Sequence, residues 1–522
     1  MADKQSLDKP DGFNLSAPLV SHLPWISGVG RWLLLALLAG HLVLRREFAH
    51  RNLADLFKAL GLSAPALFSR MYVTELALLL MFPLAMAIAY KCGWIPSIGI
   101  QQPTANSQQP GAASFLALLF LLWGFGHALV AFFAPHDTYL IFRQSAMAEY
   151  AIVFVYTFLF FGGRDEYILQ AAACMLFAAV ACAVADAAGW LRPMPDPSSL
   201  YPDEALYGQQ TLPLAIFGLG LFVVYNEHWA LRALALPVLG FVLWRQNARE
   251  LQSVVPVSIA GSLLFYVLMG AVLAWGRQFN TIKRAVVLLL FFVALLLAFR
   301  ALRKSSVEQN TEVGAWSLQN YTTLFELYDF TQPPSDSQQY VESARAPGLR
   351  VTDPEVYKLN AVYAVARGRS VSVVNNMWRL LMWRRMAHDW FYGRTLIGAG
   401  VGRGWDYNNT FFHTPFHYES DPGGLNPHNS YLNLLYRYGA IGFILVVSLM
   451  LTVLYSIWKA LRLQPKIGDV LLEGTMLFFV YTAIFIFFTV SLEGPSYSLP
   501  FWFSLGLLYA RARQLLASKD SP

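Results

Sequence analysis

The sequence predicts an all-α polytopic integral membrane protein with about 12 transmembrane helices and one long loop outside the membrane that carries amphipathic helices. Composition is the first observation that predicts this class. Of the 522 residues, 56% are apolar and only 13% are charged, whereas about 25% are charged in an ordinary soluble domain. The second observation is that the apolar residues gather into long stretches, which agrees with a mean hydropathy of +0.44.

Twelve apolar stretches are close to the roughly 20 residues that a helix needs to cross a bilayer. They lie near residues 25–44, 71–90, 113–134, 147–162, 168–190, 211–226, 229–244, 252–275, 282–300, 438–458, 469–491 and 498–512. The two stretches between 211 and 244 form either two short spans or one long bent element, because only a short polar segment separates them. The first 24 residues lack the apolar core and cleavage site of a signal peptide.

Basic residues beside the spans predict the orientation, because Lys and Arg at the ends of spans stay on the cytoplasmic side. Three clusters carry this signal: Arg277, Lys283 and Arg284; Lys459, Arg462 and Lys466; and Arg511, Arg513 and Lys519. They predict a cytoplasmic C-terminus and an external loop, and they account for the net charge of +6 without nucleic-acid binding. The basic stretch between 45 and 70 does not fit this orientation, because a twelve-span count places it on the external side. Either an N-terminal span is misassigned, or the stretch is an amphipathic surface helix.

The chain divides into N-terminal transmembrane helices (1–301), a long external loop (302–428) and C-terminal transmembrane helices (429–522). A loop this long usually carries function or is disordered. Between 371 and 395, apolar residues recur at helical spacing and alternate with arginines, which predicts an amphipathic helix on the membrane surface.

A polar cluster around His428 leads directly into the span near 438–458. Asn429 or Ser430 is a suitable N-cap, so His428 is expected at a helix N-terminus. The positive end of the helix dipole disfavours an imidazolium and attracts anions, so His428 is suited to act as a base beside an anion. The alternative is a histidine that only caps a helix at the interface. Farther along, Gly439 and Gly442 offer a small surface for a neighbouring helix.

Two groups of arginines are expected on the external side of the membrane, where Lys and Arg are scarce. Arg245 and Arg249 share a helix face at the outer end of the span near 252–275. Arg379 begins a second group that includes Arg384. The planar guanidinium fork suits phosphate recognition. The alternative is that these arginines anchor helices to lipid headgroups, or that Arg249 pairs with Glu250.

Three short runs follow one another between about 240 and 460: Arg379-Leu380-Leu381-Met382-Trp383, Leu396-Ile397-Gly398-Ala399-Gly400-Val401-Gly402, and His428-Asn429-Ser430-x-Leu432 with Gly439-x-x-Gly442. With the arginine-bearing loop before them, they resemble the signature domain of O-antigen ligases and O-antigen polymerases, which bacterial protein O-oligosaccharyltransferases share. One departure is Arg437, where members often carry a glutamate.

The resemblance implies a glycosyltransferase of the bacterial inner membrane whose active site faces the periplasm, with 302–428 as the periplasmic loop. The donor is a glycan on undecaprenyl pyrophosphate, and the acceptor is a hydroxyl of a glycan, of lipid A-core or of a protein. His428 is the expected catalytic base. Arg249, Arg245 and Arg379 are expected to bind the pyrophosphate, and Asn429, Arg384 and His417 are possible supporting residues. No cofactor or metal is needed, because pyrophosphate is already a good leaving group.

Other functions are less consistent with the residues. His413 and His417 lie four apart, but Pro415 interrupts any helix between them and no acidic ligand accompanies them at a familiar zinc spacing. A lipid-linked glycan transporter or flippase would need intramembrane charges, and the few candidates lie mostly near span ends, where they are expected to be satisfied interfacial groups: Glu75, His127, Glu149 and Asp186. Among enzymes, a ligase or polymerase is favoured over a protein-modifying transferase, because no soluble domain follows residue 512.

Overall fold

The computed structural model describes residues 24–43, 54, 57–58, 60–63, 71–91, 111–134, 136, 138–188, 261–262, 264–265, 268, 383, 386–387, 390–393, 395–402, 429–463, 470–487, 492 and 494–517. These residues form helices and turns, with no β-strand among them. The long helices are α2 (Pro24–Val43), α4 (Val73–Lys91), α5 (Ala112–Phe132), α6 (Thr138–Glu149), α7 (Ile152–Phe161), α8 (Asp165–Ala187), α18 (Ser430–Leu463), α19 (Val470–Phe485) and α20 (Pro495–Ala517).

Eight of the twelve predicted spans coincide with these helices, α6 and α7 together forming one of them. Four described helical stretches are long and apolar enough to cross a membrane: Val73–Tyr90, Ala112–Phe132, Leu140–Phe161 and Ser430–Arg462. The all-helical membrane class is therefore supported. The predicted spans 211–226, 229–244 and 282–300 lie outside the described residues, as does most of 252–275.

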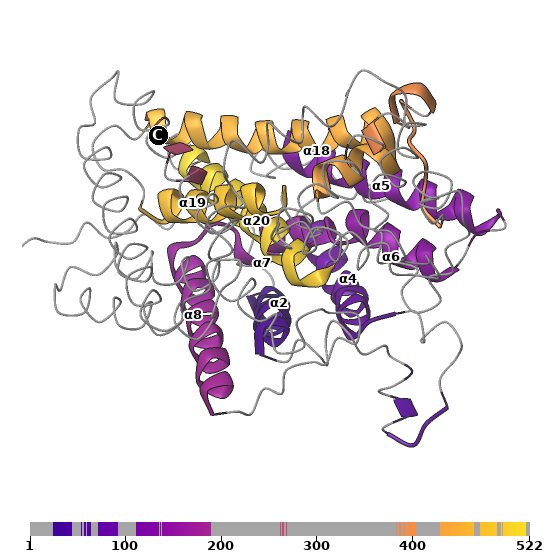
Figure 1. Ribbon diagram of the computed structural model, residues 1–522. Helices are drawn as coiled ribbons and strands as arrows, with labels where there is room; N and C mark the ends of the chain where they lie inside the picture. The colour runs from indigo at the N-terminus through magenta and orange to yellow at the C-terminus, as the bar shows by residue number, and fades with distance from the viewer. Residues whose placement is uncertain are drawn as a thin grey trace, which may run out of the picture.

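Hydrogen bonds and ion pairs join the helices at both ends of the bundle. We call residues 395–402 the strap, and the end where they lie the strap end. There Gly402 donates its N–H to Oε1 of Gln144 in α6 at 2.8 Å. His41 near the end of α2 hydrogen-bonds to Thr74 at the start of α4, and α4 is in turn joined to α6 by an ion pair. Figure 1 shows the strap, in orange, beside the beginning of α18.

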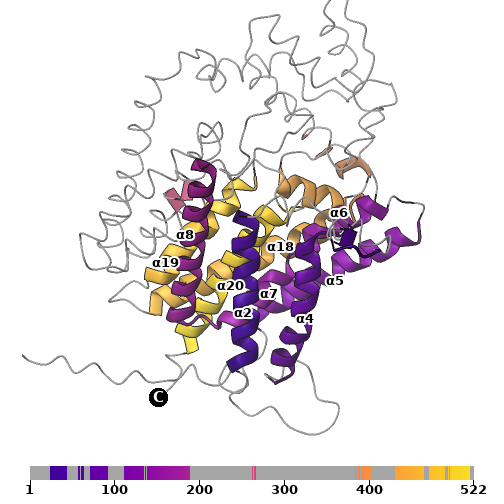
Figure 2. The same ribbon diagram turned by 90° about the horizontal axis from the view of Figure 1, so that it is seen from below.

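We call the opposite end the basic end, because the arginines near the end of α20 and the beginning of α8 lie there. Arg511 of α20 forms an ion pair with Asp165 of α8 and also donates to the carbonyl oxygen of Gly163 at 3.1 Å. Helices α8, α2 and α4 run side by side between the two ends (Figure 2). The basic stretch between 45 and 70 follows α2 and precedes α4, and most of it lies outside the described residues, so the choice between a misassigned span and a surface helix stays open.

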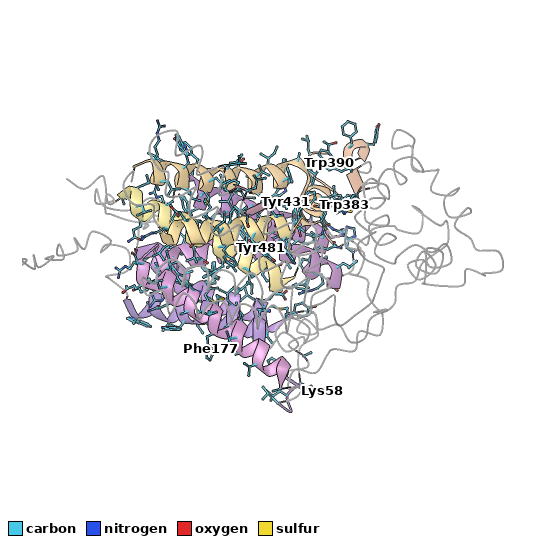
Figure 3. All side chains as sticks on the ribbon, turned by 60° about the vertical axis from the view of Figure 1, so that its left-hand side comes forward. Lys58, Phe177, Trp383, Trp390, Tyr431 and Tyr481 are labelled. Atoms are coloured by element: carbon cyan, nitrogen blue, oxygen red, sulfur yellow. The ribbon has the colours of Figure 1, made fainter. Side chains whose placement is uncertain are left out.

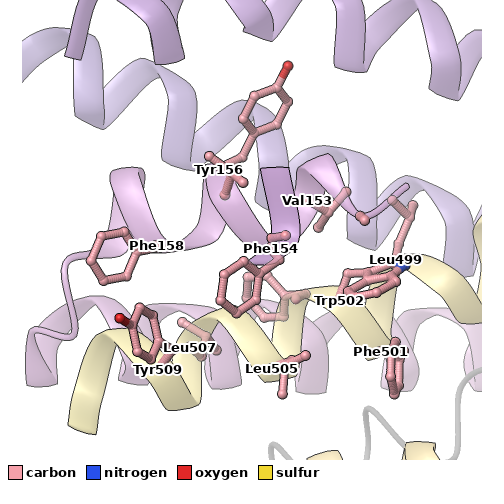
Figure 4. Packing of buried hydrophobic residues seen from close by; sticks show 14 of the residues in the cluster. Val153, Phe154, Tyr156, Phe158, Leu499, Phe501, Trp502, Leu505, Leu507 and Tyr509 are labelled. Carbon is pink, nitrogen blue, oxygen red and sulfur yellow. The ribbon is translucent and has the colours of Figure 1, made fainter. Parts of the chain in front are cut away.

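The centre of the bundle is an aromatic layer between α7 and α20. Phe154 of α7 stacks on Tyr509 at 5.8 Å between ring centroids, and Trp502 is fully buried (Figure 4). Gly506 makes this close approach possible, since a Cβ there would lie 2.8 Å from the carbonyl oxygen of Phe154. These contacts join the N-terminal and C-terminal helices into one core, on which the strap end is built.

The predicted amphipathic segment 371–395 is helical at its described residues 383, 386–387 and 390–393, and it ends in a turn at Thr395. Met386 is buried and Ala387 is exposed, as the spacing of the apolar residues predicts. Trp383 packs edge-on against Phe487 at 5.7 Å, and Tyr431 of α18 lies 6.4 Å from the same ring. Figure 3 shows Trp383, Trp390 and Tyr431 at the same end of the bundle. The end of the long loop is therefore attached to the start of α18.

Candidate functional site

The candidate site begins at the N-terminus of α18. Asn429 is buried, and its Oδ1 accepts a hydrogen bond from the N–H of Leu432 at 3.0 Å. Its own carbonyl oxygen accepts from the N–H of Asn433, also at 3.0 Å. This is the geometry of an N-cap, in which a side-chain oxygen satisfies an otherwise unpaired helical N–H. The predicted start of the helix at Asn429 is confirmed.

Ser430 and Tyr431 fix this helix start to the end of α19. The N–H of Ser430 donates to the carbonyl oxygen of Ile486 at 3.1 Å, and Oγ of Ser430 accepts from the N–H of Leu492 at 3.2 Å. The hydroxyl of Tyr431 donates to the carbonyl oxygen of Ala483 at 3.0 Å. Because three separate bonds hold two successive residues, the first turn of α18 is preorganised.

Most of the predicted site residues lie outside the described residues: His428, Arg249, Arg245, Arg379, Arg384 and His417. Asn429 is the one that the structure describes, and its side chain is used as the helix cap. His428 precedes this cap directly in the sequence. Within the described part of the chain, no group of three His, Cys, Asp or Glu side chains is placed to hold a metal ion.

Helix α18 is broken at Gly439, where φ is 67° and ψ is −171°. The break releases backbone groups that a continuous helix would pair, and the strap takes their place. The N–H groups of Ala399 and Gly400 donate to the carbonyl oxygens of Tyr436 and Arg437 at 2.7 and 2.9 Å. In the other direction, the N–H groups after the break donate to the strap: Ala440 to Thr395 at 2.8 Å and Ile441 to Leu396 at 3.2 Å. Irregular backbone of this kind is tolerated in a membrane protein only where other protein groups satisfy it.

Glycines allow the strap and α18 to approach this closely. A Cβ on Gly439 would lie 2.1 Å from the carbonyl oxygen of Leu396, and a Cβ on Gly398 would lie 2.4 Å from that of Arg437. Both glycines also have positive φ, which other residues rarely adopt. The sequence predicted that Gly439 and Gly442 would face a neighbouring helix. Gly442 does face α5, because a Cβ added to it would lie 3.2 Å from the side chain of Trp123. Gly439 lies at the break and contacts the strap instead.

Gln144 of α6 holds the end of the strap, and both α5 and α6 form hydrogen bonds with Tyr438 of α18. The fully buried Tyr438 donates its hydroxyl to the carbonyl oxygen of Gln144 at 2.9 Å, while the side chain of Gln144 accepts from Gly402. Trp123 Nε1 donates to the carbonyl oxygen of Tyr438 at 3.0 Å. The first part of α18 is therefore held on two sides, by the strap and by α5 and α6.

A buried ion pair lies next to this network, between Glu75 of α4 and Arg143 of α6. Glu75 also accepts from the N–H of Tyr72 at 2.9 Å and from the hydroxyl of Tyr150 at 3.3 Å. The guanidinium of Arg143 lies 3.8 Å above the ring of Tyr72. The expectation that Glu75 is a satisfied interfacial group is confirmed. Sequence reasoning missed Arg143, although a single arginine in an otherwise apolar stretch was a usable signal.

His127 of α5 lies beside the strap, with its ring edge-on to Trp123 and Tyr438 at 5.0 and 5.3 Å between centroids. Its Nε2 is buried, and no described residue forms a hydrogen bond with it. The expectation that His127 is a satisfied polar group at the interface is therefore wrong. Its contacts are aromatic, because α5 turns this face toward the first part of α18 rather than toward solvent.

Comparison with known proteins adds no family assignment. No protein-family model matches the sequence, and no curated protein matches it either. The resemblance to O-antigen ligases and polymerases therefore rests on the short runs between about 240 and 460 and stays a prediction. What the structure contributes is the arrangement around one of those runs: a capped helix start, a break at Gly439, and a strap that joins the two.

Proposed function

We propose that the protein is an inner-membrane glycosyltransferase that moves a glycan from undecaprenyl pyrophosphate to an acceptor hydroxyl at the strap end of the bundle. The observation that carries the proposal is the fixed start of α18. Asn429 caps this helix and Ser430 ties it to the end of α19. Since His428 is the next residue toward the N-terminus, the anchored backbone supports its use as a positioned group.

The chemistry follows from the residues of the His-Asn run and the arginine groups. The neutral imidazole of His428 accepts the proton of the acceptor hydroxyl as the oxygen attacks the anomeric carbon. The bond between that carbon and the pyrophosphate oxygen breaks, and its electrons leave with undecaprenyl pyrophosphate. Arg249, Arg245 and Arg379 stabilise the charge on the leaving group. A single displacement of this kind inverts the anomeric configuration and requires no cofactor.

The buried charges at the strap end favour an enzyme over a transporter. Glu75 and Arg143 form an ion pair, in which Glu75 also accepts hydrogen bonds from Tyr72 and Tyr150 and Arg143 stacks on the ring of Tyr72. A transport path uses intramembrane charges that change partner, whereas this pair connects α4 to α6 and supports the scaffold.

The test is complementation of a deletion strain, with lipopolysaccharide and capsule profiles compared on gels. Loss of all long chains identifies a ligase, capping by single repeats identifies a polymerase, and unchanged glycolipid identifies a protein acceptor. His428→Ala is expected to lower transfer by roughly 10²- to 10⁴-fold, the usual contribution of a positioned general base. His50→Ala, which lies outside the signature runs, is the control and should keep full activity. Full transfer by a normally expressed His428→Ala protein would refute the mechanism.

A further inference from the structure

Arg31 is a buried cation near the basic end, far from the strap. It lies on the face of α2 that carries Ser27, Leu34 and Leu38, and all four residues are buried. Only 8% of the surface of Arg31 is exposed. Its guanidinium stacks 3.5 Å above the ring centroid of Tyr167 in the first turn of α8. A charged residue on the inward face of an apolar helix is costly, so its presence requires an explanation.

No described residue provides Arg31 with an anionic partner. Its Nε and Nη1 atoms are buried, and no atom of the described chain accepts a hydrogen bond from either. The two carboxylates in the first turn of α8 are already paired, Asp165 with Arg511 and Glu166 with Arg164 at 3.6 Å. The cation–π contact with Tyr167 orients the guanidinium but does not neutralise it. One positive charge in this cluster therefore remains uncompensated among the described residues.

The position of Arg31 indicates which anion it meets. Trp25 and Trp32 of the same helix are 65% and 55% exposed, and exposed tryptophans of transmembrane helices gather at the membrane interface. The guanidinium of Arg164 lies 5.5 Å from the centroid of the same Tyr167 ring, so two guanidinium groups contact one ring between α2 and α8. A guanidinium presents parallel N–H donors that match a phosphate group. The Nε and Nη1 groups of Arg31 lose no hydrogen bond when they turn toward such a ligand.

We propose that Arg31, Arg164 and Tyr167 form a binding site for the phosphate of an anionic membrane lipid, at the basic end between α2 and α8. The lipid phosphate supplies the negative charge that Arg31 lacks among the described residues. Anionic headgroups are concentrated in the leaflet that attracts basic segments. This site is separate from the strap end and does not depend on the proposed glycosyl transfer.

The test measures lipid binding to the full-length protein in detergent, by native mass spectrometry and by thermal stability during titration with phosphatidylglycerol. The expected result is saturable binding that Arg31→Gln weakens about ten-fold, the size of one charge-assisted contact. Arg462→Gln is the matched control, because Arg462 is exposed and lies 5.1 Å from the ring of Trp458. It should change the affinity by less than about two-fold.

Three outcomes would overturn the proposal. Unchanged phosphatidylglycerol affinity in Arg31→Gln would show that Arg31 does not bind it. Equal stabilisation by inorganic phosphate would show that the ligand is a soluble anion. A fall in the apparent Tm of Arg31→Gln without lipid that exceeds the small loss expected from the Tyr167 contact would reveal an anionic partner within the protein, since removing an uncompensated buried charge is otherwise not destabilising. Arg31→Lys keeps the charge and loses the planar fork, and it should bind phosphatidylglycerol several-fold more weakly than the wild type.

Discussion

Replacing Gly439 by alanine should release the strap from α18. The alanine Cβ would lie 2.1 Å from the carbonyl oxygen of Leu396, at least 1.3 Å closer than an ordinary contact of 3.4 Å or more. The obstructing atoms are backbone atoms of Leu396 and Ile397, which cannot move aside by a change of rotamer. The φ of 67° and ψ of −171° belong to a region that is almost restricted to glycine. Forcing alanine into it costs about 1–3 kcal/mol.

The lost hydrogen bonds add to this cost. Four backbone bonds join the strap to α18, and each contributes about 1 kcal/mol net. If the Cβ displaces the strap enough to break two of them, the total destabilisation reaches about 3–5 kcal/mol. For the detergent-solubilised protein we expect the apparent Tm, followed by tryptophan fluorescence, to fall by at least about 5 °C. Transfer activity should fall with it, because the strap holds the first part of α18.

Two further variants make this prediction specific. Gly126→Ala in α5 is the control, because nothing lies within 4 Å of its added Cβ, and it should be neutral or stabilising by about 0.5–1 kcal/mol. Gly398→Ala disrupts the same contact between the strap and α18, from the side of the strap. The double variant Gly439→Ala/Gly398→Ala should therefore lose clearly less stability than the sum of the losses in the two single variants. A Gly439→Ala protein with the Tm and activity of the wild type would refute the idea that the strap holds the broken helix.

The remaining predictions concern the cap and the buried ion pair. Asn429→Ala removes the acceptor for the Leu432 N–H and should cost about 0.5–2 kcal/mol, whereas Asn429→Ser keeps a capping oxygen and should recover most of the Tm; equal losses in both variants would contradict the capping role. Glu75→Gln leaves Arg143 buried without a counter-charge and should lower stability by about 3–5 kcal/mol in denaturant titration. Adding Arg143→Met should restore most of that loss, and an unrepaired double variant would show that Glu75 stabilises the protein in another way.

The helices could be predicted because each depends on a local pattern. The apolar length that a bilayer requires locates α2, α4, α5 and α8 to within a few residues of their observed bounds. The start of α18 was also predictable, since an Asn-Ser pair before a helical pattern is a capping signal that acts within three residues. Local signals of this kind do not depend on how the helices are arranged.

The strap was not predictable from the same patterns. Three of its residues, Gly398, Gly400 and Gly402, have positive φ. Gly398 and Gly400 meet α18 about 40 residues farther along the chain, at a break that hydropathy does not mark because Gly439 lies in a continuous apolar stretch of sequence. Gly402 bonds instead to Gln144, 258 residues before it. The ion pair between Glu75 and Arg143 is equally non-local, because it joins two helices separated by α5.

The sequence by itself therefore determined the class of the protein, the position of most described helices and the residue at which α18 begins, since these follow from hydrophobic length and capping chemistry. Only the tertiary structure decided that α18 is broken at Gly439, that the strap satisfies the released backbone, and that Tyr438 joins both to α6. The physical reason is that unpaired backbone groups in an apolar environment must find partners wherever folding brings them, and such partners carry no fixed spacing in the sequence.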